Sequence, residues 1–135
     1  MKALLMIFAC LLLFLPACRY LATSPDEFAK ISRDYNNMLR WQEFDRANVA
    51  YVEQALRGEF QKKIAATRDV KVVDYRVLSL ECNAEKGEAE VKVEVDYYLL
   101  PAMRLKTVLD QQKWVYREGP GENGWRLVTV LPDFN

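Results

Sequence analysis

The segment 89–99 constrains the fold more than any other part of this 135-residue chain, because its apolar and polar residues alternate strictly. Successive side chains of a β-strand point to opposite faces, so this alternation predicts a strand with one buried face and one solvated face. Such half-buried strands are typical of antiparallel sheets that are covered on one side. The residues expected on the buried face are Ala89, Val91, Val93, Val95, Tyr97 and Leu99.

Three further segments have the composition of strands. Segment 70–82 is rich in β-branched and aromatic residues, and its alternation changes phase near Arg76, which predicts a bend or bulge. Residues 83–87 form the expected hairpin turn after it. Strands are also expected over 104–117 and 125–131, separated by a loop rich in turn residues. Together these segments predict an antiparallel sheet of about four strands.

Helical periodicity precedes the strands. Ser24 is expected to cap a helix, with Pro25 at its first position and Glu27 placed as in a capping box. A second helix is expected over about 45–66. Trp41 and Phe44, between the two helices, are expected to pack in the core. The apolar stripe of the first helix consists of Phe28, Ile31, Tyr35 and Met38.

Helices followed by a run of antiparallel strands predict the α+β class, with two N-terminal helices packed on one face of a curved sheet. The order and length of these elements resemble the NTF2-like superfamily. The closing pattern, Trp114-Val115-Tyr116, a loop and then Gly124-Trp125, is similar to its last hairpin. A cystatin-like sheet around one helix is the alternative. The superfamily includes enzymes, ligand-binding proteins and scaffolds, so the fold alone does not select a function.

The N-terminal segment has the layout of a secretory signal. Lys2 precedes an apolar run over 3–15, which as a helix would span roughly 20 Å and so fall short of a membrane span. The run ends in Leu15-Pro16-Ala17-Cys18, which resembles the lipobox of bacterial lipoproteins. That resemblance implies that the Cys18 thiol carries a diacylglycerol and that the signal is cleaved before it.

The chain is therefore expected to contain a signal peptide at 1–17, a lipidated cysteine with a short tether at 18–23, and one domain at 24–135. In Gram-negative lipoproteins an aspartate directly after the cysteine favours retention at the inner membrane. Arg19 stands there instead. The resemblance thus implies the outer membrane, facing the periplasm, if the host is Gram-negative.

The composition argues against several function classes. Lys+Arg and Asp+Glu are both 19, so the positive field that nucleic-acid binding usually needs is missing. The chain has no histidine, the commonest general base near neutral pH and the commonest metal ligand. We therefore expect no catalysis, no cofactor and no metal. Once Cys18 is lipidated, Cys82 has no partner for an internal disulfide in the mature chain and is expected to be a half-buried strand residue.

One strand face could line a pocket. Asp110, Gln112 and Trp114 share a face of the expected strand 104–117, and Tyr98 from the preceding strand could come near them. The favoured expectation is that Asp110 and Gln112 lie on the solvent face, because charged residues on strands are usually solvated. Tyr116 is roughly 20 Å along the strand from Asp110, too far for direct cooperation in catalysis.

These observations predict a membrane-anchored envelope lipoprotein that acts as a non-catalytic accessory or protein-binding module. Its expected partners are the lipid bilayer, through acylated Cys18, and an envelope protein. The alternative is a binder of a small apolar ligand in an NTF2-like cavity between helices and sheet.

Overall fold

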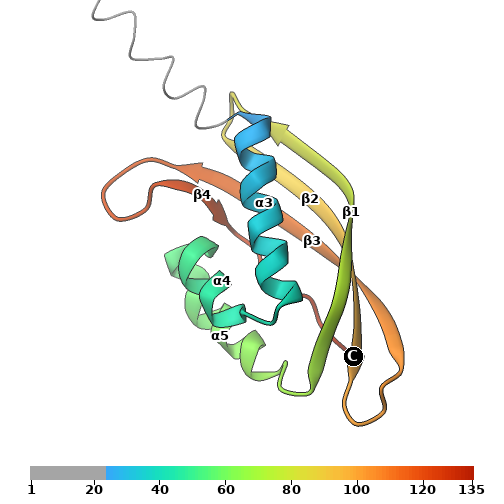
Figure 1. The fold of residues 1–135 in the computed structure, drawn as a ribbon. Helices are drawn as coiled ribbons and strands as arrows, with labels where there is room; N and C mark the ends of the chain where they lie inside the picture. The colour runs from blue at the N-terminus through green and yellow to red at the C-terminus, as the bar shows by residue number, and fades with distance from the viewer. Residues whose placement is uncertain (1–23) are drawn as a thin grey trace, which may run out of the picture.

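In the computed structural model, which describes residues 24–135, three α-helices precede a four-stranded antiparallel sheet in the order β1-β2-β3-β4 (Figure 1). The predicted α+β class is confirmed. The predicted signal peptide and Cys18 lie outside the described residues. The elements are α3 (Pro25–Arg40), α4 (Phe44–Tyr51), the short 3-10 helix η1 (Gln54–Leu56), α5 (Arg57–Ala65), β1 (Val70–Asn83), β2 (Glu88–Leu99), β3 (Leu105–Arg117) and β4 (Gly124–Leu127).

The first helix begins where the sequence predicts. The Ser24 side chain accepts a hydrogen bond from the Glu27 N–H at 3.3 Å, and Pro25 occupies the first turn, where its missing N–H costs nothing. The helix α3 lies along the sheet (Figure 1). It buries Phe28, Tyr35 and Leu39 on the side that faces the strands.

The prediction of one continuous helix over 45–66 is wrong. The chain is helical to Tyr51 and turns extended at Val52, where it forms a parallel bridge with Leu127. The Glu53 N–H donates to the Leu127 carbonyl at 3.0 Å. Helix α5 begins only at Arg57. The Val52 N–H still donates to the Asn48 carbonyl, and the helix ends at the next residue, where the bond to Leu127 replaces the helical one. Helical periodicity cannot reveal this tertiary effect.

The prediction that Trp41 packs in the core is also wrong, whereas that for Phe44 is confirmed. Trp41 is 72% exposed and Phe44 only 4%. Gln42 has a φ of 60°, in the left-handed region, and the Glu43 N–H donates to the Met38 carbonyl at 2.8 Å. This reversal at the end of α3 leaves Trp41 outside and turns Phe44 inward.

The predicted register of β2 is confirmed. Its odd positions from 89 to 97 are buried under the helices, with Val93 fully enclosed. In β1 the pairing with β2 shifts twice, between Val72 and Asp74 and between Val77 and Ser79. The expected bend near Arg76 is therefore present as two bulges that flank it. The last strand ends at Leu127, earlier than the predicted residue 131.

Aromatic rings fill the space between α3 and the sheet. The Trp114 ring lies with its centroid 5.7 Å from that of Phe28 and 5.3 Å from that of Tyr35, both edge to face. The centroid of the Trp125 ring lies 4.7 Å from that of Phe28. None of the helices within 24–135 has the length and apolar character needed to cross a bilayer.

Candidate functional site

Four polar side chains are buried in the middle of this apolar interface. Ser32 and Asn36 come from α3, one helical turn apart on the side that faces the sheet. Asp110 and Gln112 come from β3, two residues apart and therefore on the same face. None of the four is more than 3% exposed. We call this group the Asp110 cluster.

The cluster satisfies its own hydrogen bonds. The Gln112 Nε2 donates to the Asn36 Oδ1 and to the Asp110 Oδ2, both at 2.8 Å. The Asn36 Nδ2 donates to the Ser32 carbonyl at 2.8 Å. Buried polar groups are costly unless paired. The amide of Gln112 therefore links α3 to β3 across the core.

The carboxyl of Asp110 is the titratable centre of the cluster. Burial raises the pKa of Asp110 to about 6, and the hydrogen bond from Gln112 opposes this shift in part. Burial, followed by the negative charge of Asp110, raises the pKa of the Tyr35 hydroxyl well above its ordinary value. Asp110 can thus take up a proton at a pH near neutrality, while Tyr35 keeps its own.

The favoured expectation that Asp110 and Gln112 lie on the solvent face is wrong. They lie on the helix-covered face with Trp114, and the outward positions of β3 include the exposed apolar residues Leu105 and Leu109. On β3, polar side chains thus occupy part of the buried face and apolar side chains occupy part of the exposed face. The arrangement is tolerated because Asn36 of α3 accepts a hydrogen bond from Gln112, which also donates to Asp110, and a single strand sequence does not show this partner.

Of the four proposed pocket residues, the structure brings together Asp110, Gln112 and Trp114 but not Tyr98. Tyr98 pairs with Leu105 and belongs to the opposite face of β2, while Asp110 pairs with Val93 five residues away. Tyr116 lies instead beside Trp125, with ring centroids 5.6 Å apart.

Sequence reasoning missed Ser32 and Asn36. Both lie next to the predicted apolar stripe of α3, at positions four residues apart. Two small polar residues at that spacing can mark a solvated flank of the helix or a buried pair. Only the hydrogen bond between Asn36 and Gln112 of β3 shows that the pair is buried.

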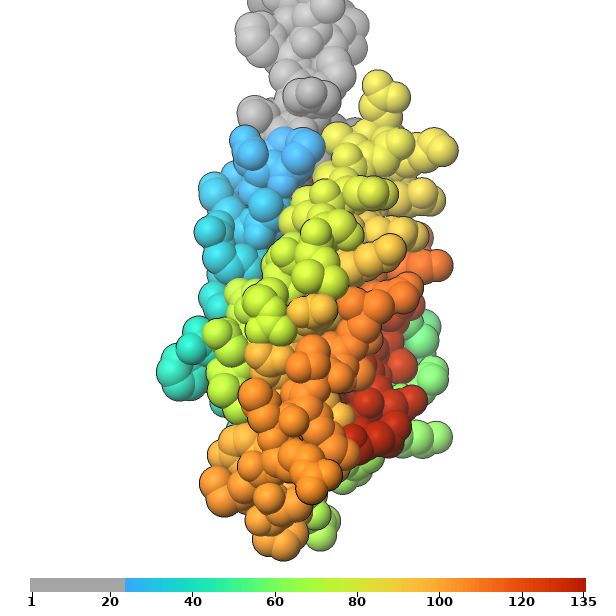
Figure 2. Space-filling view, turned by 90° about the vertical axis from the view of Figure 1, so that its right-hand side faces the viewer, coloured from blue at the N-terminus to red at the C-terminus, as the bar shows by residue number. Residues whose placement is uncertain are grey.

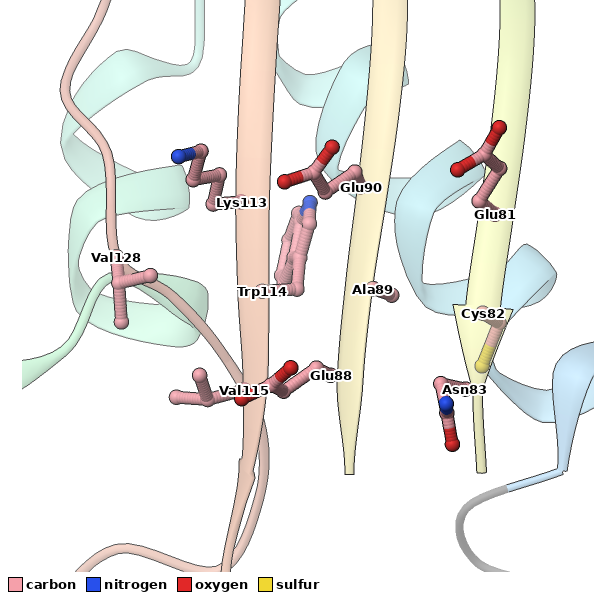
Figure 3. Close-up of a pocket in the computed structure, with 10 residues that line it drawn as sticks. All are labelled: Glu81, Cys82, Asn83, Glu88, Ala89, Glu90, Lys113, Trp114, Val115 and Val128. Carbon is pink, nitrogen blue, oxygen red and sulfur yellow. The ribbon is translucent and has the colours of Figure 1, made fainter. Parts of the chain in front are cut away.

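A separate hollow of about 480 Å³ lies across β1, β2 and β3 near the hairpin 83–87. Figure 3 looks onto these strands with the helices behind them. Most residues that line the hollow occupy outward strand positions, which alternate along each strand with the buried inward ones. The hollow therefore opens on the face of the sheet away from α3. Its lining is mixed. Glu81, Glu88, Glu90 and Lys113 contribute charges, while Ala89, Trp114, Val115 and Val128 contribute apolar surface. The Asp110 cluster has no part in it.

Cys82 occupies an inward position of β1 at the edge of this hollow and is half-buried, as predicted. Burial raises the pKa of its thiol, which disfavours the reactive thiolate. Among residues 24–135, no three His, Cys, Asp or Glu side chains are grouped so as to hold a metal ion. Comparison of the chain with protein-family models, with curated proteins and with solved structures found no match.

Proposed function

We propose that this chain is a lipid-anchored protein of a bacterial cell envelope, whose α+β domain serves as a non-catalytic binding module close to the membrane. The observation that carries the proposal is the sequence Leu15-Pro16-Ala17-Cys18 at the end of the apolar run. Helix α3 begins at Pro25, so residues 19–23 alone separate Cys18 from the cap at Ser24. Five extended residues reach roughly 17 Å, which keeps the domain at the membrane surface.

The Asp110 cluster supports a structural role better than a catalytic one. A catalytic acid or base needs access to a substrate proton. Here the side chains of Asp110, Gln112 and Asn36 are hydrogen-bonded to one another beneath α3. The hollow across β1, β2 and β3, which could admit a molecule, lies on the other face of the sheet and does not include this carboxyl.

The alternative, a binder of a small apolar ligand, has less support. Such a ligand would need space between the helices and the sheet, and the rings of Phe28, Tyr35 and Trp114 occupy that space in mutual contact. The hollow across β1, β2 and β3 lies on the other face of the sheet, and three carboxylates share its lining with apolar side chains, so it is not the apolar cavity that this alternative requires.

We propose an NTF2-like or cystatin-like fold for the domain. Three helices ahead of the sheet support the NTF2-like description. One long helix, α3, against a four-stranded meander supports the cystatin-like one.

Fatty-acid labelling tests the anchor. The full chain should incorporate labelled palmitate in a bacterial host and fractionate with the outer membrane. Cys18→Ser should abolish the label and leave the larger precursor, whereas the control Cys82→Ser should keep the label and the processing. Palmitate labelling that persists in Cys18→Ser would refute the proposal.

The binding role has its own test. The anchored protein, cross-linked in cells and extracted with detergent, should capture one envelope protein in a fixed ratio. Release of a small molecule on denaturation, with no protein captured, would instead favour the ligand-binding alternative.

A further inference from the structure

The hairpin between β2 and β3 carries exposed apolar side chains at its tip. Leu100, Met103 and Leu105 are 38%, 66% and 63% exposed. The hairpin lies at the end of the molecule opposite the start of α3 (Figure 1). Figure 2 shows it in orange, protruding at the lower end, with the start of α3 in blue at the upper end. We call residues 100–105 the hairpin tip.

Backbone hydrogen bonds fasten the hairpin tip to the rest of the domain. The Leu100 N–H donates to the Asp69 carbonyl at 2.9 Å, and the Met103 N–H donates to the Leu99 carbonyl at 3.1 Å. Met103 has a φ of 48°, in the left-handed region that favours glycine. A methionine at this position costs backbone free energy and adds exposed apolar surface, and such outliers gather at functional sites. The hairpin tip is therefore a candidate contact surface.

Basic side chains surround the hairpin tip. The adjoining segments 66–71 and 100–106 contain four basic residues against one acidic residue, a net charge of +3. The whole chain has 19 residues of each sign, so this excess is local. Within residues 24–135, no salt bridge involves Arg68, Lys71 or Arg104, which we call the basic collar. Lys106 donates to the Asn135 carbonyl at 2.6 Å.

The apolar and basic groups lie in order along the hairpin. Lys71 of β1 is paired in register with Tyr98 of β2, two residues before Leu100. At 3.3 Å per residue, its Cα lies roughly 7 Å behind that of Leu100 along the strand. The three carboxylates of the hollow lie near the opposite hairpin, 83–87. A negatively charged surface therefore attracts the tip end of the domain more than the other end.

We propose that the hairpin tip and its basic collar form a membrane-contact site, which enters the headgroup region of a bilayer that contains anionic lipids. Such a bilayer presents negative phosphates first and apolar acyl chains roughly 5–10 Å deeper. When the tip enters, its apolar side chains reach the acyl chains while the basic collar stays level with the phosphates. Arg104 lies within the tip, and its long side chain can reach back to the phosphates while its stem stays in apolar surroundings.

The contact does not rest on the proposed Cys18 anchor. With the anchor in place, the contact fixes the orientation of the domain. Strand β2 is 12 residues long, so it separates the two ends of the sheet by roughly 40 Å. The tether reaches roughly 17 Å. Both ends therefore meet the bilayer that holds the anchor when the domain lies along its surface rather than standing on it.

The depth of the hairpin tip in vesicles tests the proposal. The full chain, with its three native cysteines replaced by serine, carries Met103→Cys labelled with a polarity-sensitive dye and is reconstituted from detergent into vesicles. The control dye is attached at Val49→Cys, a 69% exposed position on α4. The apolar run 3–15 can hold this chain to any vesicle, so the readout is quenching of the dye by lipids with brominated acyl chains. Quenching is expected at position 103 in vesicles that contain phosphatidylglycerol, much less in phosphatidylcholine alone, and not at position 49.

Charge reversal separates the basic collar from the overall charge. Arg68→Glu with Arg104→Glu, at two exposed positions, should abolish the quenching at position 103. The control Arg33→Glu with Arg46→Glu changes the net charge equally at exposed positions on α3 and α4 and should leave the quenching unchanged. Both variants should keep the circular dichroism spectrum of the original chain, and the comparison of the two lipid mixtures needs neither of them.

Three results would overturn the proposal. The first is a dye at position 103 that is not quenched in anionic vesicles, or is quenched no more than the dye at position 49. The second is an equal loss of quenching in the two charge-reversal variants. The third is a photoreactive residue at position 103 that cross-links in cells to a protein and not to lipid, which would assign the hairpin tip to a protein partner. Because the cysteine-free chain cannot be lipidated, none of these results depends on the anchor.

Discussion

Replacing the buried carboxyl of Asp110 by an amide should change how the stability of the domain depends on pH. Asp110→Asn keeps the size of the side chain, and its carbonyl oxygen can still accept the hydrogen bond from Gln112. The variant cannot ionise. The comparison with the original chain therefore isolates the cost of holding a negative charge in the core.

The magnitude follows from the two protonation equilibria. Burial raises the pKa of Asp110 in the folded chain to about 6, from a reference value of 3.8. Because the folded state binds this proton more tightly than the unfolded state, protonation of Asp110 adds stability as the pH falls, and this gain is lost as the pH rises through about 6. Over the whole pH range that spans both pKa values, protonation of Asp110 adds about 3 kcal/mol to the free energy of unfolding, of which about 2 kcal/mol falls between pH 4.5 and pH 7.5.

Urea unfolding at pH 4.5 and at pH 7.5 measures this effect. The free energy of unfolding of Asp110→Asn minus that of the original chain should be about 2 kcal/mol higher at pH 7.5 than at pH 4.5, so that the variant is relatively more stable at the higher pH. The control Asp69→Asn, at an exposed position, should show no such change. If the difference between Asp110→Asn and the original chain is the same at both pH values, the carboxyl does not titrate in the core, and the reasoning fails.

Two further predictions concern the core. Val93→Lys should lower the free energy of unfolding by more than about 3 kcal/mol, because it places an unpaired charge where no solvent reaches. Glu94→Lys on the outer face should lower it by less than about 1 kcal/mol. Equal melting temperatures of the two variants would show that the register of β2 is wrong. Phe44→Ala should cost about 3 to 5 kcal/mol by leaving a cavity, whereas Trp41→Ala should change the stability by less than about 1 kcal/mol, as measured by urea unfolding. A large loss in Trp41→Ala would contradict the exposed position of this ring.

The sequence alone predicted the elements whose signals are local. The alternation over 89–99 specifies both the strand and its buried face, because with a period of two only one of the two faces carries the valines that must be buried. The cap at Ser24 specifies the start of α3 through hydrogen bonds within four residues. The hairpin 83–87 depends on its own turn residues, among them Gly87 with its φ of 64°.

The tertiary structure decided the rest, and in each case the deciding contact joins residues far apart in the chain. Val52 leaves the helix to pair with Leu127, so a sequence with unbroken helical periodicity yields two helices. Asp110 and Gln112 have the composition of a solvated strand face, yet they lie in the core because Asn36 of α3 supplies a partner at 2.8 Å. Burial of a polar group depends on whether a partner can reach it, and this is a property of the packed elements rather than of either segment alone.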